Sequence, residues 1–220
     1  MIPLRDRNPT STVPVVNFLL IGINLAVFIY ELSLGDEVEL LFMQYGVIPK
    51  DVVFALSGLP IDPFPLVTLF TSMFLHGGWV HLLGNMLYLW VFGDNVEDKV
   101  GHGRYIIFYL VCGLSATGFH VLLEPSGSLP TVGASGAISG VLAAYLVMFP
   151  KVRVLTVIPI FIFLQTAELP AVVVLGMRFV IQFFNGLASV GRVETGGVAW
   201  WAHIGGFIAG LLLILPFKRR

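Results

Sequence analysis

Two short stretches of the sequence hold residue types that carry out nucleophilic catalysis. Ser135 lies in TVGASGAISG (residues 131–140), and His203 lies in AWWAHIGG (residues 199–206). A serine hydroxyl becomes a good nucleophile when a base takes its proton, and histidine is the usual base because its pKa lies near the operating pH. Ser135 and His203 are therefore a candidate catalytic pair for acyl transfer.

A third stretch, HGGWVHLLGNM (residues 76–86), contains His81 and Asn85, which are four residues apart. On a helix this spacing places both side chains on the same face. The tetrahedral intermediate of acyl transfer needs hydrogen-bond donors aimed at its oxyanion. The Asn85 amide, the His81 ring and the backbone N–H of Ser135 are the expected donors.

The composition predicts an all-α membrane protein. The chain of 220 residues is 57% hydrophobic and only 11% charged, whereas about a quarter of the residues in a soluble domain are charged. Most of its surface is therefore expected to face the lipid bilayer. Residues 1–220 are expected to form a single transmembrane domain, because no tail or linker is long enough for a second one.

Neither a cofactor nor a metal is expected. Cys112 is the only cysteine, so an internal disulfide is excluded and a thiolate metal site is disfavoured. None of the five histidines has a zinc-like spacing supported by carboxylates. The net charge of −1 and the lack of a basic patch give no indication of a nucleic-acid partner.

Six segments are candidates for spanning helices, each close to the roughly 20 apolar residues that a bilayer requires. They are residues 15–34, 79–96, 105–123, 132–149, 169–187 and 198–217. Residues 1–14 are expected to form a short N-terminal segment, and residues 35–78 a long first loop. Residues 154–163 are apolar but short and contain Pro159, so they are expected to form a hairpin or interfacial piece, or else to extend the fifth helix backwards.

The positive charges predict the orientation, since Lys and Arg accumulate in cytoplasmic loops. Six spans place both termini on one side, and that side holds Arg5, Arg7, Lys99, Arg104, Lys151, Arg153 and Lys218 to Arg220. Only Lys50 and Arg192 fall on the opposite side, which also has an acidic first loop. Both termini are therefore expected to be cytoplasmic.

The same topology brings the candidate residues to one depth. The second, fourth and sixth spans all start on the outer side, and at about 1.5 Å per residue Ser135, His203, His81 and Asn85 lie roughly 5–12 Å below the outer ends. No Asp or Glu at this depth is placed to orient the histidine. The expected arrangement is a Ser–His dyad without a third acidic member.

Close helix packing is the alternative explanation for the small residues around the serine, and taken alone it is the commoner one. It leaves the buried imidazoles unexplained, because polar groups at membrane depth are costly. The glycines at and near the site are expected to allow close helix packing, and those next to the serine also to let a substrate come close. They are Gly133, Gly136, Gly140, Gly206 and Gly210. Arg178, in the middle of the fifth span, has no evident partner.

The combination of motifs resembles the rhomboid family of intramembrane serine proteases. It consists of GASG with Ser135, AHIGG with His203, HxxxN with His81 and Asn85, FGDNVED (residues 92–98) and AHxxGxxxG (residues 202–210). The resemblance covers about residues 70–215. It implies a six-helix bundle with a short central fourth helix that begins at the nucleophile, a water-filled cavity open to the outside, and transmembrane helices as substrates.

By position, the resemblance makes Ser135 the nucleophile, His203 the base, and His81, Asn85 and the Ser135 amide the oxyanion hole. Two features depart from the family pattern. The Trp-Arg pair that many relatives carry in the first outer loop is absent. Ser139 occupies the position where some relatives have an aromatic residue stacked on the catalytic histidine.

The expected function is cleavage of transmembrane protein substrates near the outer face of the plasma membrane, in which the protein is multi-pass. The N-terminus has neither a signal-peptide nor a transit-peptide pattern. Two alternatives stay open: an inactive relative that binds transmembrane helices without cutting them, and a small transporter that uses the same polar cavity. The sequence gives no oligomeric state.

Overall fold

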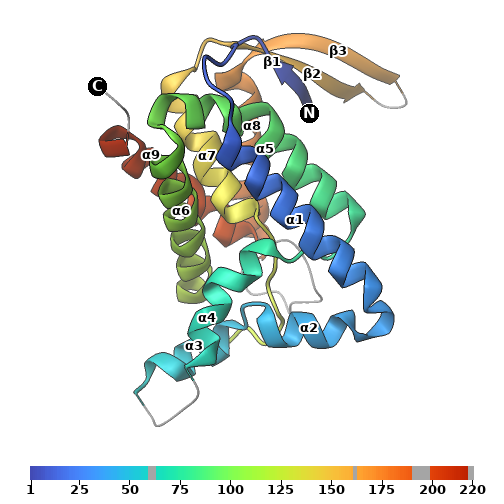
Figure 1. The fold of residues 1–220 in the computed structure, drawn as a ribbon, viewed down its shortest axis with the longest axis vertical. Helices are drawn as coiled ribbons and strands as arrows, with labels where there is room; N and C mark the ends of the chain where they lie inside the picture. Colours follow the sequence, from blue (N-terminus) through green and yellow to red (C-terminus); the bar gives the residue numbers. More distant parts are fainter. Residues whose placement is uncertain (59–62, 161–162, 190–198, 218–220) are drawn as a thin grey trace.

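A computed structural model describes residues 1–58, 63–160, 163–189 and 199–217 and is mostly helical. The long helices are α1 (Val15–Ser33), α5 (Trp79–Val100), α6 (His102–Leu123), α7 (Ser135–Met148), α8 (Ala171–Ser189) and α9 (Trp200–Phe217). α7 is the central helix: it packs against α5, α6, α8 and α9, and residues 136–145 are all buried (Figure 1). The helix that carries Ser135 is therefore surrounded by the others.

The expected spans agree with these helices to within a few residues at most ends. Within the described ranges, α1, α6, α8 and α9 are long and apolar enough to cross a membrane. A fifth span is formed if α5 is joined to the preceding helical segment at a 77° bend, whereas α7 is a shorter apolar helix. The residue at which the sixth span is expected to begin, Val198, lies outside the described residues, as do Arg192 and Lys218 to Arg220.

The long first loop is largely helical. It contains two 3₁₀ turns, Gly35–Glu37 and Ser72–Phe74, and three short helices: α2 (Val38–Tyr45), α3 (Pro49–Leu56) and α4 (Phe64–Thr71). An antiparallel bridge joins Val47 to Thr131, with N–O distances of 2.9 and 2.7 Å. The first loop is thereby attached to the segment that leads into Ser135.

A small antiparallel sheet lies at one end of the bundle and contains strands β1 (Ile2–Asp6), β2 (Arg153–Ile160) and β3 (Phe163–Pro170), in that order (Figure 1). The hairpin expected around residues 154–163 is therefore confirmed, and the alternative extension of the fifth helix is wrong. The pairing of β1 with β2 places Ile2 opposite Val157. The end of α9 lies toward the same end of the bundle, since the Phe217 ring packs against Phe108 near the start of α6, with centroids 5.6 Å apart.

The FGDNVED stretch at the end of α5 holds α1 in place. The buried Glu97 carboxylate accepts hydrogen bonds from the backbone N–H groups of Val16 (3.0 Å) and Asn17 (2.7 Å). The first amides of a helix lack partners within that helix, and a negative charge is favourable at this end of the helix dipole. Gly93 leaves the space into which the Asn17 side chain fits.

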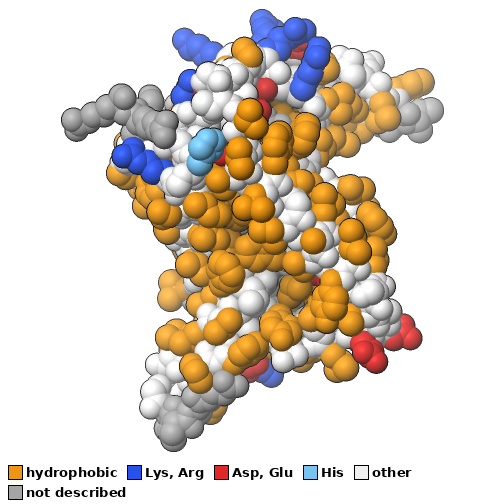
Figure 2. All heavy atoms as spheres, in the orientation of Figure 1, with side chains coloured by type: hydrophobic (Ala, Val, Ile, Leu, Met, Phe, Trp, Pro, Cys, Tyr) orange, Lys and Arg blue, Asp and Glu red, His pale blue; other side chains and the backbone are white. Residues whose placement is uncertain are grey.

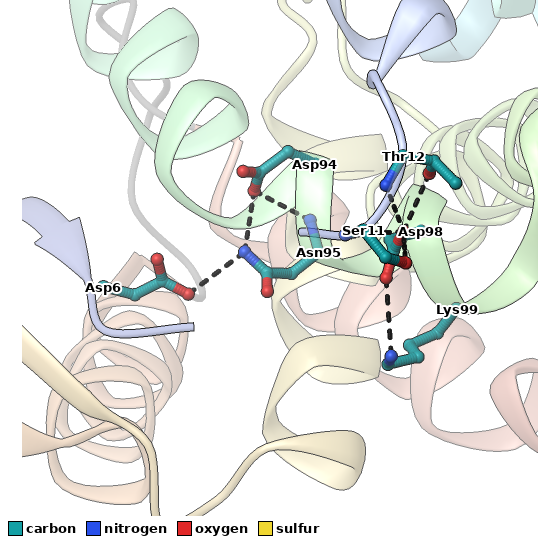
Figure 3. Close-up of polar contacts among 7 residues, drawn as sticks. All are labelled: Asp6, Ser11, Thr12, Asp94, Asn95, Asp98 and Lys99. Atoms are coloured by element: carbon teal, nitrogen blue, oxygen red, sulfur yellow. Dashed lines mark hydrogen bonds and ion pairs between the residues drawn. The ribbon is translucent and has the colours of Figure 1, made fainter. Parts of the chain in front are cut away.

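The same stretch holds the N-terminal segment (Figure 3). Asp98 accepts hydrogen bonds from the backbone and hydroxyl groups of both Ser11 and Thr12, at 2.7–3.2 Å. The side-chain amide of Asn95 donates to Asp6 at 3.1 Å. Residues 1–14 are therefore an ordered part of the bundle, fixed to the end of α5.

The exterior has the pattern of a membrane protein (Figure 2). Hydrophobic side chains cover a broad belt around the middle of the bundle on the face shown. Lys and Arg gather at the end that carries the sheet, whereas Asp and Glu appear at both ends, including the end where the first loop follows α1. The belt and the helices apolar enough to span a bilayer make this a multi-pass membrane protein.

Helices α6, α7 and α9 approach so closely that the glycines at their contacts cannot carry side chains. A Cβ at Gly206 would overlap the carbonyl oxygen of Gly136, and one at Gly210 would overlap the carbonyl of Gly140. A Cβ at Gly136 would lie 2.6 Å from the Cβ of Ala116 on α6. The backbones of α7 and α9 are thus in direct contact.

We expect Gly206→Ala to lower stability by about 1–3 kcal/mol, the usual cost of overpacking a filled core. Gly22→Ala is the matched control, because a Cβ at Gly22 on α1 meets nothing within 4 Å. In a helix this exchange alone raises stability by roughly 0.5–1 kcal/mol. Thermal unfolding in detergent should move the midpoint down for Gly206→Ala and up for Gly22→Ala; a rise for both would contradict the close contact.

The attachment of the N-terminal segment should depend on pH. Burial, with a contribution from the nearby Asp94 carboxylate, raises the pKa of Asp6 from 3.8 to about 6. The docked segment therefore binds this proton more tightly than the released one, so the contribution of Asp6 to docking is fully present below about pH 4 and is lost as pH rises through 6. The hydrogen bonds from Ser11 and Thr12 lower the pKa of Asp98, so the contribution of Asp98 is constant above pH 4 and is lost only at lower pH. The Arg7–Glu168 ion pair does not oppose this trend above pH 4.5, because Arg7 lowers the pKa of Glu168.

Amide hydrogen exchange of residues 2–6, expressed as protection factors, should show stronger protection at pH 5 than at pH 7.5. In Asp6→Asn, which cannot ionise, the difference between the two pH values should largely disappear. Equal protection of the wild-type segment at both pH values would show that Asp6 does not control its docking.

Candidate active site

Ser135 and His203 are in direct contact. The Ser135 hydroxyl oxygen lies 2.7 Å from Nε2 of His203, a hydrogen bond between the first residue of α7 and the first turn of α9. The hydroxyl donates this bond if Nε2 is unprotonated, which is the arrangement that a general base requires. The expectation that Ser135 lies a few residues below the end of its helix is wrong, since α7 begins at Ser135 itself.

The turn before α7 depends on Gly133. Its φ of +129° is one that residues with a side chain rarely adopt, and its amide donates to the Ser72 carbonyl at 2.8 Å. A Cβ at this position would lie 2.6 Å from Nε2 of His81 and 3.6 Å from the Ser135 hydroxyl. Gly133 thus precedes the helix and leaves space for the imidazole of His81 beside the serine.

The start of α7 offers backbone donors at the serine. The Ile138 amide is the first to bond to a carbonyl of the helix, that of Ala134, at 3.0 Å. The amides of residues 135–137 therefore precede the hydrogen-bond ladder of α7. Such a helix end is a ready site for negative charge, which the oxyanion of an acyl-transfer intermediate would carry.

A cavity of about 990 Å³ connects these groups. Ser135, His203, His81 and Asn85 all line it, and its walls come from α5, α7, α8, α9 and the segment before α7. The structure thus brings the four site residues expected from the sequence to one cavity. Gly136, Gly140, Gly206 and Gly210 lie where α6, α7 and α9 meet.

His76 is a further member of the site, which its place in the HGG motif does not reveal. It is 1% exposed, and its Nδ1 lies 3.3 Å from the carbonyl oxygen of Phe74, so Nδ1 carries the hydrogen. Its Nε2 can then accept from the Asn85 side-chain amide, 3.0 Å away. This bond fixes the Asn85 amide and leaves its second N–H free to point into the cavity.

The His76 position is itself fixed by α1. The backbone N–H of His76 donates to the Glu31 carboxylate at 3.0 Å, and Glu31 is 3% exposed. A carboxylate at the end of α1, an imidazole before α5 and an amide on α5 therefore form one chain of hydrogen bonds. The first helix reaches the site through this chain.

The His203 ring is oriented by packing. Trp200, one turn earlier on α9, packs edge-on against it, with ring centroids 6.1 Å apart and an interplanar angle of 89°. Within the described residues, Nδ1 of His203 is buried and has no hydrogen-bond partner. Ser139, at the position where some relatives have an aromatic, donates instead to the Ser135 carbonyl at 2.8 Å.

The sequence matches the family profile described as "Rhomboid domain" over residues 63–220. This chain belongs to the rhomboid family. The match includes α5 to α9 and the site residues Ser135, His203, His81, Asn85 and His76. The Ser135–His203 hydrogen bond and all the lining residues of the cavity except Met1 therefore lie within the matched region.

Similar curated proteins also carry rhomboid names, in keeping with the family match. The chain is 30% identical over 145 residues to RHOMBOID-like protein 5 of Arabidopsis thaliana, covering 66% of this chain and 42% of that protein. It is 34% identical over 142 residues to the rhomboid protease GluP of Bacillus subtilis (64% and 24%), and 28% identical over 205 residues to the mitochondrial Rhomboid protein 1 of Saccharomyces cerevisiae (78% and 54%). The chain spans about a quarter to a half of the length of these relatives.

The site has no evident metal-ligand set. Among the described residues, no group of three or more His, Cys, Asp or Glu side chains is placed to hold one ion. Cys112 is buried and packs against Gly140 on α7.

With Asn85 as the oxyanion donor expected from the sequence, His76→Ala should lower kcat with KM little changed, because the His76 ring holds the Asn85 amide. Asn85→Ala should cost about 10²-fold, the low end for loss of one oxyanion donor, and His76→Ala no more than that. The double variant should be no slower than Asn85→Ala, because both changes remove the same interaction. If the kcat losses of the two single variants add up in the double variant, His76 does not act through Asn85.

Proposed function

We propose that this protein is an intramembrane serine endopeptidase that cuts transmembrane protein substrates with a Ser135–His203 dyad. The observation that carries the proposal is the 2.7 Å hydrogen bond between Ser135 and His203 at a cavity within an apolar helical bundle. Membership of a family that includes the rhomboid protease GluP supports the same reaction.

The first half of the reaction forms an acyl-enzyme. Nε2 of His203 takes the proton of the Ser135 hydroxyl as the serine oxygen attacks the peptide carbonyl carbon. The tetrahedral intermediate then collapses, the C–N bond breaks, and the imidazolium gives its proton to the leaving amine. In the second half, water attacks the ester, His203 takes a proton from the water and returns one to Ser135.

The oxyanion would be bound by three donors: the Ser135 amide, the free N–H of the Asn85 side chain and the His81 ring. The proposal is supported by the unpaired amides at the start of α7 and by the His76–Asn85 hydrogen bond. Donors held in place before the reaction stabilise the transition state without reorganisation cost. His81 lies beside the serine across Gly133, as this role requires.

We infer six membrane crossings with both termini in the cytoplasm. The bent α4–α5 segment and the short α7 would add two crossings to the four long apolar helices. The gathering of Lys and Arg at the end with the sheet supports a cytoplasmic location for that end (Figure 2). Ser135, at the opposite end of α7, would then face the outer side.

We place the protein in the plasma membrane, with the substrate cut near its outer face. A peptide bond in an intact helix must be unwound before attack, and unwinding in lipid leaves backbone groups unsatisfied, which costs several kcal/mol for each group. Near the outer end these groups can be satisfied by water in the cavity. Substrates with helix-breaking Gly or Pro after the cut should therefore be preferred.

We expect Ser135→Ala and His203→Ala each to reduce cleavage of a single-span reporter by about 10⁴-fold or more, with the double variant no worse than either, because the dyad acts as a unit. The assay uses purified protein in liposomes, with mass spectrometry of the fragments. Unchanged gel-filtration behaviour and thermal midpoint serve as the folding control.

The same assay separates the alternatives. Retained cleavage in Ser135→Ala would remove the serine from the reaction. Binding of the reporter without any cleavage by wild type would favour an inactive helix-binding relative. A cut at the cytoplasmic end of the reporter span would contradict the proposed orientation.

A further inference from the structure

Arg178 places a permanent positive charge in the wall of the cavity. Its guanidinium carbon lies 4.0 Å from the centroid of the Tyr88 ring, so the contact links α8 to α5. Among the described residues that line the cavity, Arg178 has the only Lys, Arg, Asp or Glu side chain. Ser135 and His203 line the same cavity.

This guanidinium lacks an anionic partner within the described part of the chain. None of the ion pairs there includes Arg178, and its Nε is buried without a hydrogen-bond partner. A charged side chain at membrane depth is costly and usually has a partner or a function. The Tyr88 ring compensates part of the charge, but a π-face leaves the N–H donors of the guanidinium unused.

The depth of Arg178 relative to Ser135 follows from the packing of α7 and α8. α8 begins beside the end of α7, where the Ala171 amide donates to the Val152 carbonyl at 2.8 Å. At a rise of about 1.5 Å per residue, Arg178 lies roughly 10 Å from the start of α8, and Ser135 lies roughly 20 Å from the end of α7, both measured toward the outer end of the bundle. The Cα atom of Arg178 is therefore roughly 10 Å farther from the outer end than the Cα atom of Ser135.

We propose that Arg178 is a specificity residue that binds a carboxylate on the membrane segment of the substrate. Five N–H donors in a planar fork match the two oxygens of an Asp or Glu side chain. A separation of roughly 10 Å corresponds to about three extended residues or seven helical ones. The preferred acidic residue lies three to seven residues from the scissile bond, on the side that continues into the membrane.

A substrate carboxylate fits this position better than a lipid phosphate does. Arg178 lies inside the bundle on the wall of the Ser135 cavity, whereas lipid phosphates remain at the membrane surface. Gln182, one turn farther along the same face of α8, is 6% exposed and also lines the cavity, so it adds a polar group to the subsite. This inference rests on the proposed function and names the substrate feature that it would select.

The test is a set of single-span reporters that share one cut site and carry Glu or Gln at each of the ten following positions. We expect wild type in phosphatidylcholine liposomes to favour Glu over Gln in kcat/KM by about tenfold at positions three to seven, in keeping with one charge-assisted hydrogen bond. Arg178→Gln should cleave each Glu and Gln pair at equal rates. Arg104→Gln, an exposed arginine on α6, should keep the wild-type ratio.

Each outcome decides a different claim. Equal cleavage of Glu and Gln reporters by wild type at every position overturns the subsite and leaves the protease assignment intact. A Glu preference that persists in Arg178→Gln also overturns it. If wild type cleaves no reporter, binding of the same peptides to Ser135→Ala decides: tighter binding of Glu than Gln that is lost in Ser135→Ala/Arg178→Gln supports the subsite, and equal binding overturns it.

Discussion

The direct contact between the backbones of α7 and α9 is the constraint on which the rest of the site depends. Ser135 and His203 lie near the starts of these two helices, so the packing of α7 against α9 fixes the distance between the two side chains. Gly136 and Gly140 on α7 meet Gly206 and Gly210 on α9, and their missing side chains permit that approach. Small residues serve this purpose in membranes, where helix association relies on packing more than on the hydrophobic effect. The packing explanation and the catalytic explanation for these glycines are therefore complementary.

Several buried polar groups in this bundle are compensated by contacts between segments far apart in the sequence. Glu97 caps α1, Glu31 at the end of α1 accepts from His76, and His76 holds Asn85. The N-terminal segment returns to Asp98 and Asn95 at the end of α5 (Figure 3). One end of α1 thus supports the site, and the other end is held by the same stretch of α5 that holds the N-terminal segment.

The sequence was sufficient for the parts of the fold that local patterns encode. Apolar runs located the long helices, and the family resemblance placed Ser135 at the start of a short central helix, as observed. Hydropathy predicted a fourth helix that starts too early, at Val132, because Val132 and Gly133 are apolar or small. The helix starts at Ser135 instead, because Gly133 has a positive φ that a helix does not allow. Hydropathy alone does not report a positive φ.

Long-range pairings could not be predicted. β1 pairs with β2 about 150 residues away, and neither strand has an alternation pattern long enough to identify it. The ring contact between Trp200 and His203 is another case, because only their spacing of three residues on α9 indicates it in the sequence. His76 likewise looks like part of a glycine-rich turn until the fold brings Asn85 to 3.0 Å from it.

The central claim is that His203 activates Ser135 as a nucleophile. A fluorophosphonate probe, which reacts covalently with activated serines, tests this without any substrate. Peptide mapping by mass spectrometry should find the label on Ser135 of the wild-type protein, strongly reduced labelling of Ser135 in His203→Ala, and none at this position in Ser135→Ala. Labelling of Ser135 at the same rate with and without His203, or labelling confined to another residue, would contradict the claim.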